Sequence, residues 1–329
     1  MKDQTLNRAA LKKIILSICI VSALAYTISI NSPQANISNG IINATLYLPD
    51  AENGYYRASR FDWAGQISAL EYKGHSYFGL WYDKYDPYLH DAIMGPVEAF
   101  DPIGYEDAAT GGSFIKIGIG ALEKPEEKNY FFANNYKLVN PGRWDIKKAS
   151  DKIKFIHTLN DTTISYVYTK IVQLTKGKPE LVLYHTIKNT GKKTIETNVM
   201  NHNFFVIDSQ VTSSHFEINF PFEPIVEESN EPKAAVIQGK QILLEDGDPK
   251  GKNFYLGPIT GYSQSADDYN VTIRNEKTGA AVNIRADKPF SRLAFWATVK
   301  TVCPEPFIHV KAEPGEEFSW KIIYTFEAK

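Results

Sequence analysis

Short runs of apolar or alternating residues, separated by turn-forming residues, follow one another from Ile37 to the end of the chain. Clear examples are Ile41–Tyr47, Phe114–Ile119, Ile153–Thr158, Thr163–Val172, Leu181–Lys188 and Ala281–Ile284. No long stretch shows the 3.6-residue period of an amphipathic helix, so this pattern of short runs and turns is typical of antiparallel strands. The sequence therefore predicts an all-β fold, a large antiparallel β-sandwich over about residues 35–329.

Three segments predict strands near the residues that carry chemistry. Leu181–Lys188 and Thr194–Met200 flank an Asn-Thr-Gly turn signal and predict a hairpin that leads into His202. Lys288–Val299 predicts a buried strand that leads toward Glu305. In the closing segment, 317–326, aromatic and aliphatic residues alternate with polar ones, which predicts a half-buried strand. We expect His202 and Glu305 at strand ends, where a sheet holds loops in place.

The N-terminus has the three parts of a secretory signal. Arg8, Lys12 and Lys13 precede the apolar run Ile14–Leu24, and Ala23-Leu24-Ala25 fits a cleavage site before residue 26. We predict a signal peptide over residues 1–25, a single domain over 26–329, and a secreted or periplasmic protein. An uncleaved anchor is the alternative, although the apolar run is short for a membrane span.

Charge and cysteine content exclude several classes of protein. Residues 1–25 hold four basic and one acidic residue, so a net charge of −2 for the whole chain becomes −5 without them. No basic block is present, which argues against a nucleic-acid partner, and no membrane partner is expected beyond the signal. Cleavage would remove Cys19 and leave Cys303 alone, so we expect no internal disulfide.

Two motifs far apart in the chain carry acid–base chemistry. Asn201-His202-Asn203-Phe204-Phe205 places an imidazole between two amides that can fix its tautomer and orientation. Cys303-Pro304-Glu305-Pro306 places a carboxylate between two prolines, which restrict its backbone. A positioned imidazole and a positioned carboxylate can move a proton between two oxygens. We predict His202 and Glu305 as catalytic residues; the alternatives are a structural histidine and an exposed turn carboxylate.

These motifs, in this order, resemble those of aldose 1-epimerases (mutarotases) over about the last two-thirds of the chain. That family carries an Asn-His-x-Tyr/Phe-Phe segment with the general acid and a Cys-x-Glu-Pro-like segment with the general base. The resemblance implies the galactose mutarotase-like supersandwich and the interconversion of sugar anomers. It makes His202 the acid and Glu305 the base, and we predict that Asn201 and Asn203 contact the sugar.

The segment Gly54–Trp63 interleaves two arginines with aromatic residues. Such a cluster can stack on a sugar or hydrogen-bond to a sugar acid. The family that the chain resembles places a substrate-binding arginine in an early strand, and Arg60 is the nearest match. We predict Arg57 and Arg60 as substrate-binding; the alternative is an arginine pair that bridges Asp62 or Asp83 on the surface.

The segment His90–Phe100 departs from the pattern of that family. It lacks the characteristic Asn-Arg pair, and Glu98 stands near the position of the amide. The family's His-Gly-Gly histidine also has no counterpart, because Thr110 precedes Gly111-Gly112. We predict that His90 and Glu98 contact the substrate instead, which would change the sugar that is accepted.

The remaining histidines show no metal-ligand spacing, and the sequence lacks HExxH, CxxC, GxSxG and glycine-rich phosphate loops. We therefore predict no metal and no cofactor, while scattered oxygens leave a calcium site open.

The leading hypothesis is an epimerase that acts on a mono- or oligosaccharide, uronic acids included. The alternatives are a non-catalytic carbohydrate-binding module and a polysaccharide lyase or hydrolase on the same fold. A hydrolase needs a second carboxylate opposite Glu305, for which Glu98 is the candidate. The first discriminating observation is whether His202 and Glu305 share one pocket.

Overall fold

Strands make up nearly all of the regular structure. The computed structural model describes residues 32–162, 164–230, 234–246 and 253–329, and the elements of these ranges lie in the unit Pro33–Lys329. Within these ranges the helical elements are two short 3-10 helices, Ile207–Ser209 and Ala266–Asp268. The all-β prediction is confirmed, and the predicted signal segment 1–25 lies outside the described residues.

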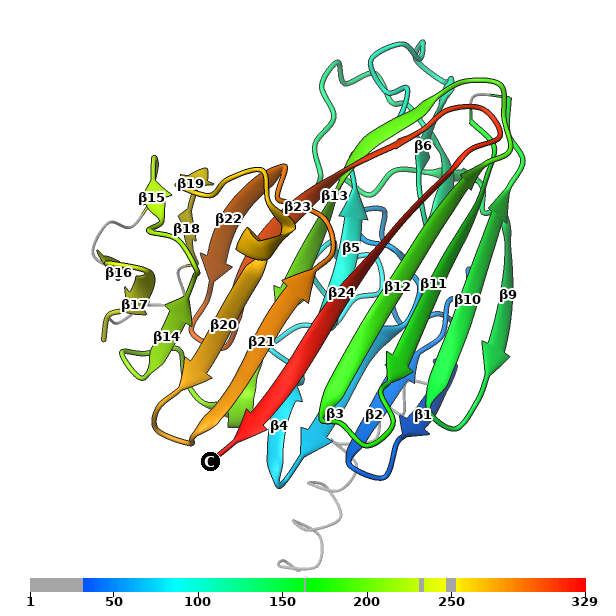
Figure 1. The fold of residues 1–329 in the computed structure, drawn as a ribbon. Helices are drawn as coiled ribbons and strands as arrows, with labels where there is room; N and C mark the ends of the chain where they lie inside the picture. Colours follow the sequence, from blue (N-terminus) through cyan, green and yellow to red (C-terminus); the bar gives the residue numbers. More distant parts are fainter. Residues whose placement is uncertain (1–31, 163, 231–233, 247–252) are drawn as a thin grey trace, which may run out of the picture. The chain divides into compact units, whose positions relative to one another are not determined.

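The largest sheet has ten strands, each antiparallel to its neighbours. Figure 1 shows this sheet from β16 at one side to β9 at the other. In spatial order its strands are β16 (Ala235–Gln238), β17 (Gln241–Leu244), β14 (Phe216–Asn219), β20 (Asn270–Asn275), β21 (Ala280–Ala286), β24 (Glu317–Ala328), β12 (Glu180–Asn189), β11 (Tyr166–Leu174), β10 (Lys152–Leu159) and β9 (Arg143–Lys148).

A five-stranded antiparallel sheet carries the two motifs. In spatial order its strands are β18 (Phe254–Leu256), β22 (Arg292–Ala297), β23 (Val302–Ala312), β13 (Ile195–Phe204) and β5 (Gly95–Phe100). The smaller sheets comprise β1 (Gln34–Ser38), β2 (Ile42–Tyr47), β3 (Gln66–Tyr72) and β4 (His75–Phe78); β6 (Ser113–Lys116), β7 (Gly120–Glu123) and β8 (Leu138–Asn140); and β15 (Ile225–Val226) with β19 (Ile259–Thr260).

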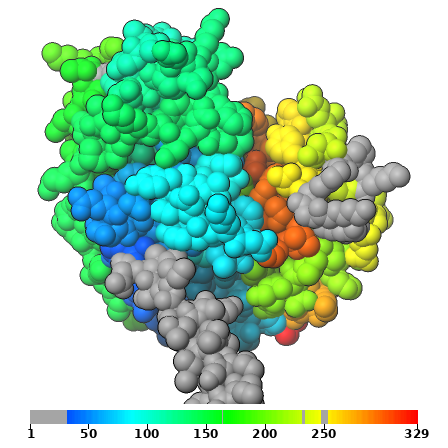
Figure 2. Space-filling model, turned by 180° about the vertical axis from the view of Figure 1, so that it is seen from behind, coloured from blue at the N-terminus to red at the C-terminus, as the bar shows by residue number. Residues whose placement is uncertain are grey.

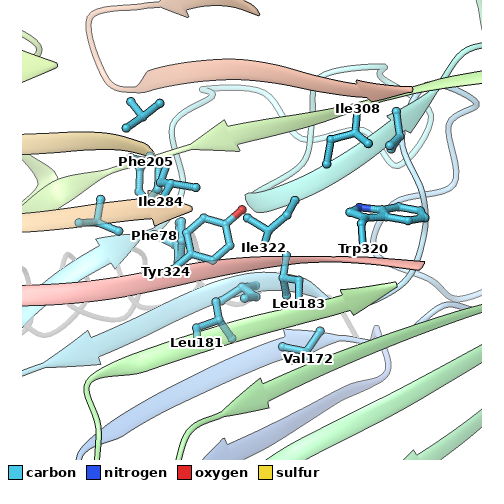
Figure 3. Packing of buried hydrophobic residues seen from close by; sticks show 14 of the residues in the cluster. Phe78, Val172, Leu181, Leu183, Phe205, Ile284, Ile308, Trp320, Ile322 and Tyr324 are labelled. Atoms are coloured by element: carbon cyan, nitrogen blue, oxygen red, sulfur yellow. The ribbon is translucent and has the colours of Figure 1, made fainter. Parts of the chain in front are cut away.

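The core lies between the layers, where the apolar side chains at alternate positions of the strands meet. Figure 3 shows Ile322 and Tyr324 of β24 beside Leu183 of β12, with Phe205 and Ile308 contributed by the other layer. Side-chain burial on β24 alternates from Trp320 to Phe326, as the sequence pattern predicts, because successive side chains of a strand point to opposite faces. Each fully buried side chain of this kind stabilises the fold by about 1.5–3 kcal/mol.

The predicted hairpin between Leu181–Lys188 and Thr194–Met200 is wrong. β12 pairs with β11 and β24 in the ten-stranded sheet, whereas β13 pairs with β5 and β23 in the five-stranded sheet. Asn189 stabilises the connection from β12 to β13, because its side-chain amide donates to the carbonyls of Lys193 (2.8 Å) and Ala312 (2.9 Å). The turn signal specified a change of direction, but it carried no information about the partner strand.

The expectation that Glu305 follows the end of a strand is also wrong. Pro304, Glu305 and Pro306 lie inside β23, which pairs with strands on both sides. The β13–β23 register runs to Met200↔Phe307 and pairing resumes only at the isolated bridge Phe205↔Val302, so the prolines occupy a gap in the ladder. Proline has no N–H to donate, and this gap removes the need for one.

Candidate functional site

The alternation of side chains on β13 separates His202 from its two neighbours. Asn201 and Asn203 face the interior between the sheets, where the hydroxyl of Tyr324 lies 2.8 Å and 2.9 Å from their side-chain oxygens. Tyr324 belongs to β24 of the ten-stranded sheet. Consecutive residues of a strand point to opposite faces, so His202 faces the other side of the five-stranded sheet.

His202 and Glu305 meet on that face. His202 Nε2 lies 3.0 Å from Glu305 Oε1, and the two residues are only 2% and 7% exposed. The imidazole is stacked on Phe204 with ring centroids 3.9 Å apart, and Phe61 contacts it edge-on. Its Nδ1 is buried and makes no hydrogen bond within the described part of the chain. The rings therefore hold the imidazole against the carboxylate, while one nitrogen still has capacity for a partner.

Both side chains line a pocket of about 540 Å³. Met200 and Phe307 of the same sheet face provide apolar surface beside the pair, and Trp296 lines the pocket next to His202. In the view of Figure 2 the cyan segment before β5 lies beside the orange strand β22, in agreement with the contact of Trp81 with Trp296. An apolar surface with a few convergent polar groups is the usual make-up of a small-molecule site.

Arg60 and His90 form a polar wall of this pocket through Asp91. The guanidinium of Arg60 donates to Asp91, whose other oxygen lies 3.1 Å from His90 Nε2. Burial alone would raise the pKa of Asp91, but the hydrogen bond from His90 and the charge of Arg60 outweigh it and lower this pKa. Phe132 covers the guanidinium at 4.3 Å. The structure thus brings His202, Glu305, Arg60 and His90 together.

The structure places the other four predicted substrate contacts outside the pocket. Glu98 is fully buried on the opposite face of β5, where its carboxylate contacts Lys170 and, at 3.1 Å, His185. Asn201 and Asn203 lie on that same interior face. Arg57 donates to the carbonyl of Glu52 (2.5 Å) and lies over the ring of Tyr88. The prediction that these side chains bind the sugar directly is corrected accordingly.

Several lining residues were missed by the sequence-based reasoning. Asp91 follows His90 directly and could have been included with it, and Lys116 interrupts an apolar run, which is an unusual place for an amine. Arg292 had no such signal. It reaches the pocket because β22 pairs Arg292 with Phe307, which in turn pairs with Met200.

Among the described residues, no group of three or more His, Cys, Asp and Glu side chains could hold a metal ion. In the same ranges no helix is both long and apolar enough to cross a membrane.

No protein-family model and no curated protein sequence matches the chain. Solved structures match it over most of its length. The galactose mutarotase related enzyme from Lactobacillus acidophilus is 13% identical, with a TM-score of 0.55 over 90% of this chain and 97% of that one. The fold is that of galactose mutarotase-like proteins.

Two further structures agree with this assignment of the fold. The GalM/aldose epimerase homologue from C. elegans is 14% identical, with a TM-score of 0.52 over 90% of this chain and 99% of that one. A galactose mutarotase-like protein from Lactobacillus casei is 13% identical, with a TM-score of 0.53 over 89% and 100%. At these identities the likeness concerns the fold, so the chemistry must be argued from the pocket.

Proposed function

We propose that this protein is an aldose 1-epimerase-like enzyme that interconverts the anomers of a free mono- or oligosaccharide. The observation that carries the proposal is the 3.0 Å contact of His202 Nε2 with Glu305 Oε1 in the wall of the pocket. The anomeric hydroxyl oxygen O1 and the ring oxygen O5 are both bonded to C1 of the sugar. An acid and a base that serve these two oxygens must therefore be close neighbours, as His202 and Glu305 are.

The reaction needs two proton transfers. Glu305 as carboxylate takes the proton of the O1 hydroxyl, and His202 as imidazolium gives a proton to O5, so that the C1–O5 bond breaks and an open-chain aldehyde forms. Rotation about C1–C2 presents the other face of the carbonyl, and the reverse transfers close the ring. The acid and base have to start in opposite protonation states.

Exchange spectroscopy by NMR on freshly dissolved hexoses and hexuronic acids tests the proposal. The parent protein should accelerate anomer exchange, and Glu305→Gln and His202→Asn should each lower kcat by roughly 10²–10⁴-fold while sugar binding persists. A matched control lies on the same two strands, because His309 of β23 contacts Glu196 of β13 at 3.3 Å on the exposed surface. His309→Asn and Glu196→Gln should leave exchange unchanged.

The alternatives predict different results. A carbohydrate-binding module would bind sugar without accelerating exchange in the parent protein. A hydrolase would release sugar from a polymer, but Glu98, its candidate second carboxylate, is buried between the sheets. If the parent accelerates exchange and Glu305→Gln is equally fast, the assignment of the base is wrong.

We also propose that the chain is exported through its first 25 residues, on the sequence pattern alone. Mass spectrometry of the protein recovered from the periplasm or medium of expressing bacteria tests this. Tyr26 is the expected N-terminus, and recovery of a chain that starts at Met1 would contradict cleavage.

A further inference from the structure

Lys116 is a buried amine in the wall of the pocket. It ends β6, only 3% of the residue is exposed, and its Nζ donates to the carbonyl oxygen of Phe100 on β5. In the described ranges it forms no ion pair; the acid whose charge reaches it is Asp101, which accepts a hydrogen bond from Asn198 (3.1 Å). An amine without a counter-ion is costly to bury.

Tyr130 supplies a second donor at the same place. Its ring centroid lies 5.5 Å from Lys116 Nζ, and the ring is stacked on Tyr136 with centroids 5.2 Å apart. Its hydroxyl is buried and has no hydrogen-bond partner among the described residues, although the residue lines the pocket. A buried hydroxyl is normally hydrogen-bonded, and each exception needs an explanation. The site thus holds a hydroxyl without an acceptor beside an amine that has a backbone carbonyl as its acceptor but no ion-pair partner among the described residues.

We propose that Lys116 and Tyr130 form a subsite for the carboxylate of a hexuronic acid whose C1 lies at His202 and Glu305. The proposal rests on the proposed function and names its substrate class. A carboxylate has only acceptors, so it matches an amine and a hydroxyl, and it supplies the missing counter-charge. The carbonyl of Phe100, which anchors Lys116, belongs to β5, the strand next to β13, and Phe100 pairs with Val199, three residues before His202. Lys116, His202 and Glu305 all line the same pocket of about 540 Å³.

Binding of such a ligand is coupled to protonation. Burial lowers the pKa of Lys116 to about 7; Asp101 opposes this shift and Arg60 adds to it. Burial raises the pKa of Tyr130, so its hydroxyl remains a donor across the neutral range. A carboxylate beside Lys116 would raise the pKa of the amine. Above neutral pH the arrival of a uronate must then draw a proton from solution, whereas a neutral hexose draws none.

The test compares galacturonate with galactose, and glucuronate with glucose, because the members of each pair differ only at C6. Calorimetry of the full chain at pH 8, in two buffers of different ionisation enthalpy, measures affinity and proton uptake. We expect each uronate to bind about tenfold or more tightly than its hexose, with net proton uptake. Lys116→Met should abolish the uptake and the preference, and Tyr130→Phe should weaken uronate binding about tenfold.

Controls keep the result interpretable. Lys137→Met alters an exposed lysine that pairs with Glu123 at 2.7 Å, and it should change nothing. If Lys116→Met fails to fold, Tyr130→Phe alone decides, since it removes one hydroxyl group. Equal affinity for uronate and hexose, or proton uptake that survives Lys116→Met, would overturn the subsite. Loss of the preference in Arg292→Gln instead would place the carboxylate on the opposite side of the pocket and also overturn it.

Failure of the subsite and failure of the proposed function are distinguishable. Accelerated anomer exchange of galactose without a uronate preference supports the enzyme and overturns the subsite. Uronate binding with proton uptake, but without exchange of any sugar, supports the subsite and overturns the epimerase.

Discussion

The side-chain amide of Asn203 donates a hydrogen bond of 3.0 Å to the carbonyl oxygen of Pro304, the residue before Glu305. The same Nδ2 lies 2.8 Å from Asn201 Oδ1, and the hydroxyl of Tyr324 joins both asparagines from the facing sheet. The bond to Pro304 crosses the gap that the prolines leave in the β13–β23 ladder, and the other bonds hold the asparagine amide in place. Asn203 therefore acts as a positioning residue for Glu305, from the face opposite to the pocket.

Asn203→Ala should impair catalysis and stability together. Loss of the buried amide leaves the Pro304 carbonyl without this donor, which should lower the free energy of unfolding by about 2–4 kcal/mol. We expect kcat to fall roughly tenfold with little change in KM, because Glu305 loses its support while the pocket wall remains. Kinetics and urea denaturation measure both quantities. Asn283→Ala, a partly exposed amide bonded to Asn270, is the control; an equal loss of kcat in both variants would contradict the positioning role.

The buried charges behind the site should be sensitive to the removal of one partner. Lys170 is fully buried, contacts Glu98 and lies 3.7 Å from Asp62. Lys170→Met leaves these carboxylates without a cation, so we expect a loss of about 3–5 kcal/mol in the free energy of unfolding. The double variant Lys170→Met/Glu98→Gln should recover part of that loss. Denaturant titration checks this, and a double variant no more stable than Lys170→Met would argue against charge burial as the cause.

Stability should depend on pH through Asp62. Burial raises the pKa of its carboxyl from 3.8 to about 7, against the charge of Lys170. The folded state then binds more protons than the unfolded chain between these values, so this group makes the protein less stable as pH rises from about 4 to about 7. Asp62→Asn cannot titrate, and its stability relative to the parent should increase across that window, by on the order of 1–4 kcal/mol.

Urea denaturation of both proteins at several pH values between 4.5 and 7.5 measures this difference. Glu98 does not confuse the result. Burial alone would raise the pKa of Glu98, but Lys170 and His185 lower it to about 2. The contribution of Glu98 to the free energy of unfolding is therefore lost only below about pH 4.5. A stability difference between Asp62→Asn and the parent that stays constant with pH would refute the assignment.

The two early arginines should differ in their effect on the substrate. Arg60 lines the pocket and pairs with Asp91, so Arg60→Gln should raise KM about tenfold, the equivalent of one charged hydrogen bond. Arg57 binds the carbonyl of Glu52 outside the pocket, so Arg57→Gln should leave KM within about twofold. Steady-state kinetics on the preferred sugar decides between them, and equal effects would mean that the sugar reaches beyond the pocket.

Local patterns in the sequence predicted the strands and the residue types of the site. The alternation in β24 identifies a strand with one buried face, and Trp320, Ile322, Tyr324 and Phe326 are buried as that pattern requires. The motifs around His202 and Glu305 drew attention to two side chains that the structure places 3.0 Å apart. Both results depend on information that lies within a few neighbouring residues.

Tertiary structure alone decided which sheet each strand joins and which face becomes the pocket. Asn201, His202 and Asn203 are consecutive in the sequence. Of these three only His202 reaches the pocket, because alternate residues of a strand point to opposite faces. Glu98 follows the same rule on β5 and is buried, whereas Arg292 reaches the pocket through two successive strand pairings. Alternation is a local property, but strand pairing and the burial of one face arise from contacts between residues about 100 or more positions apart, which no short motif encodes.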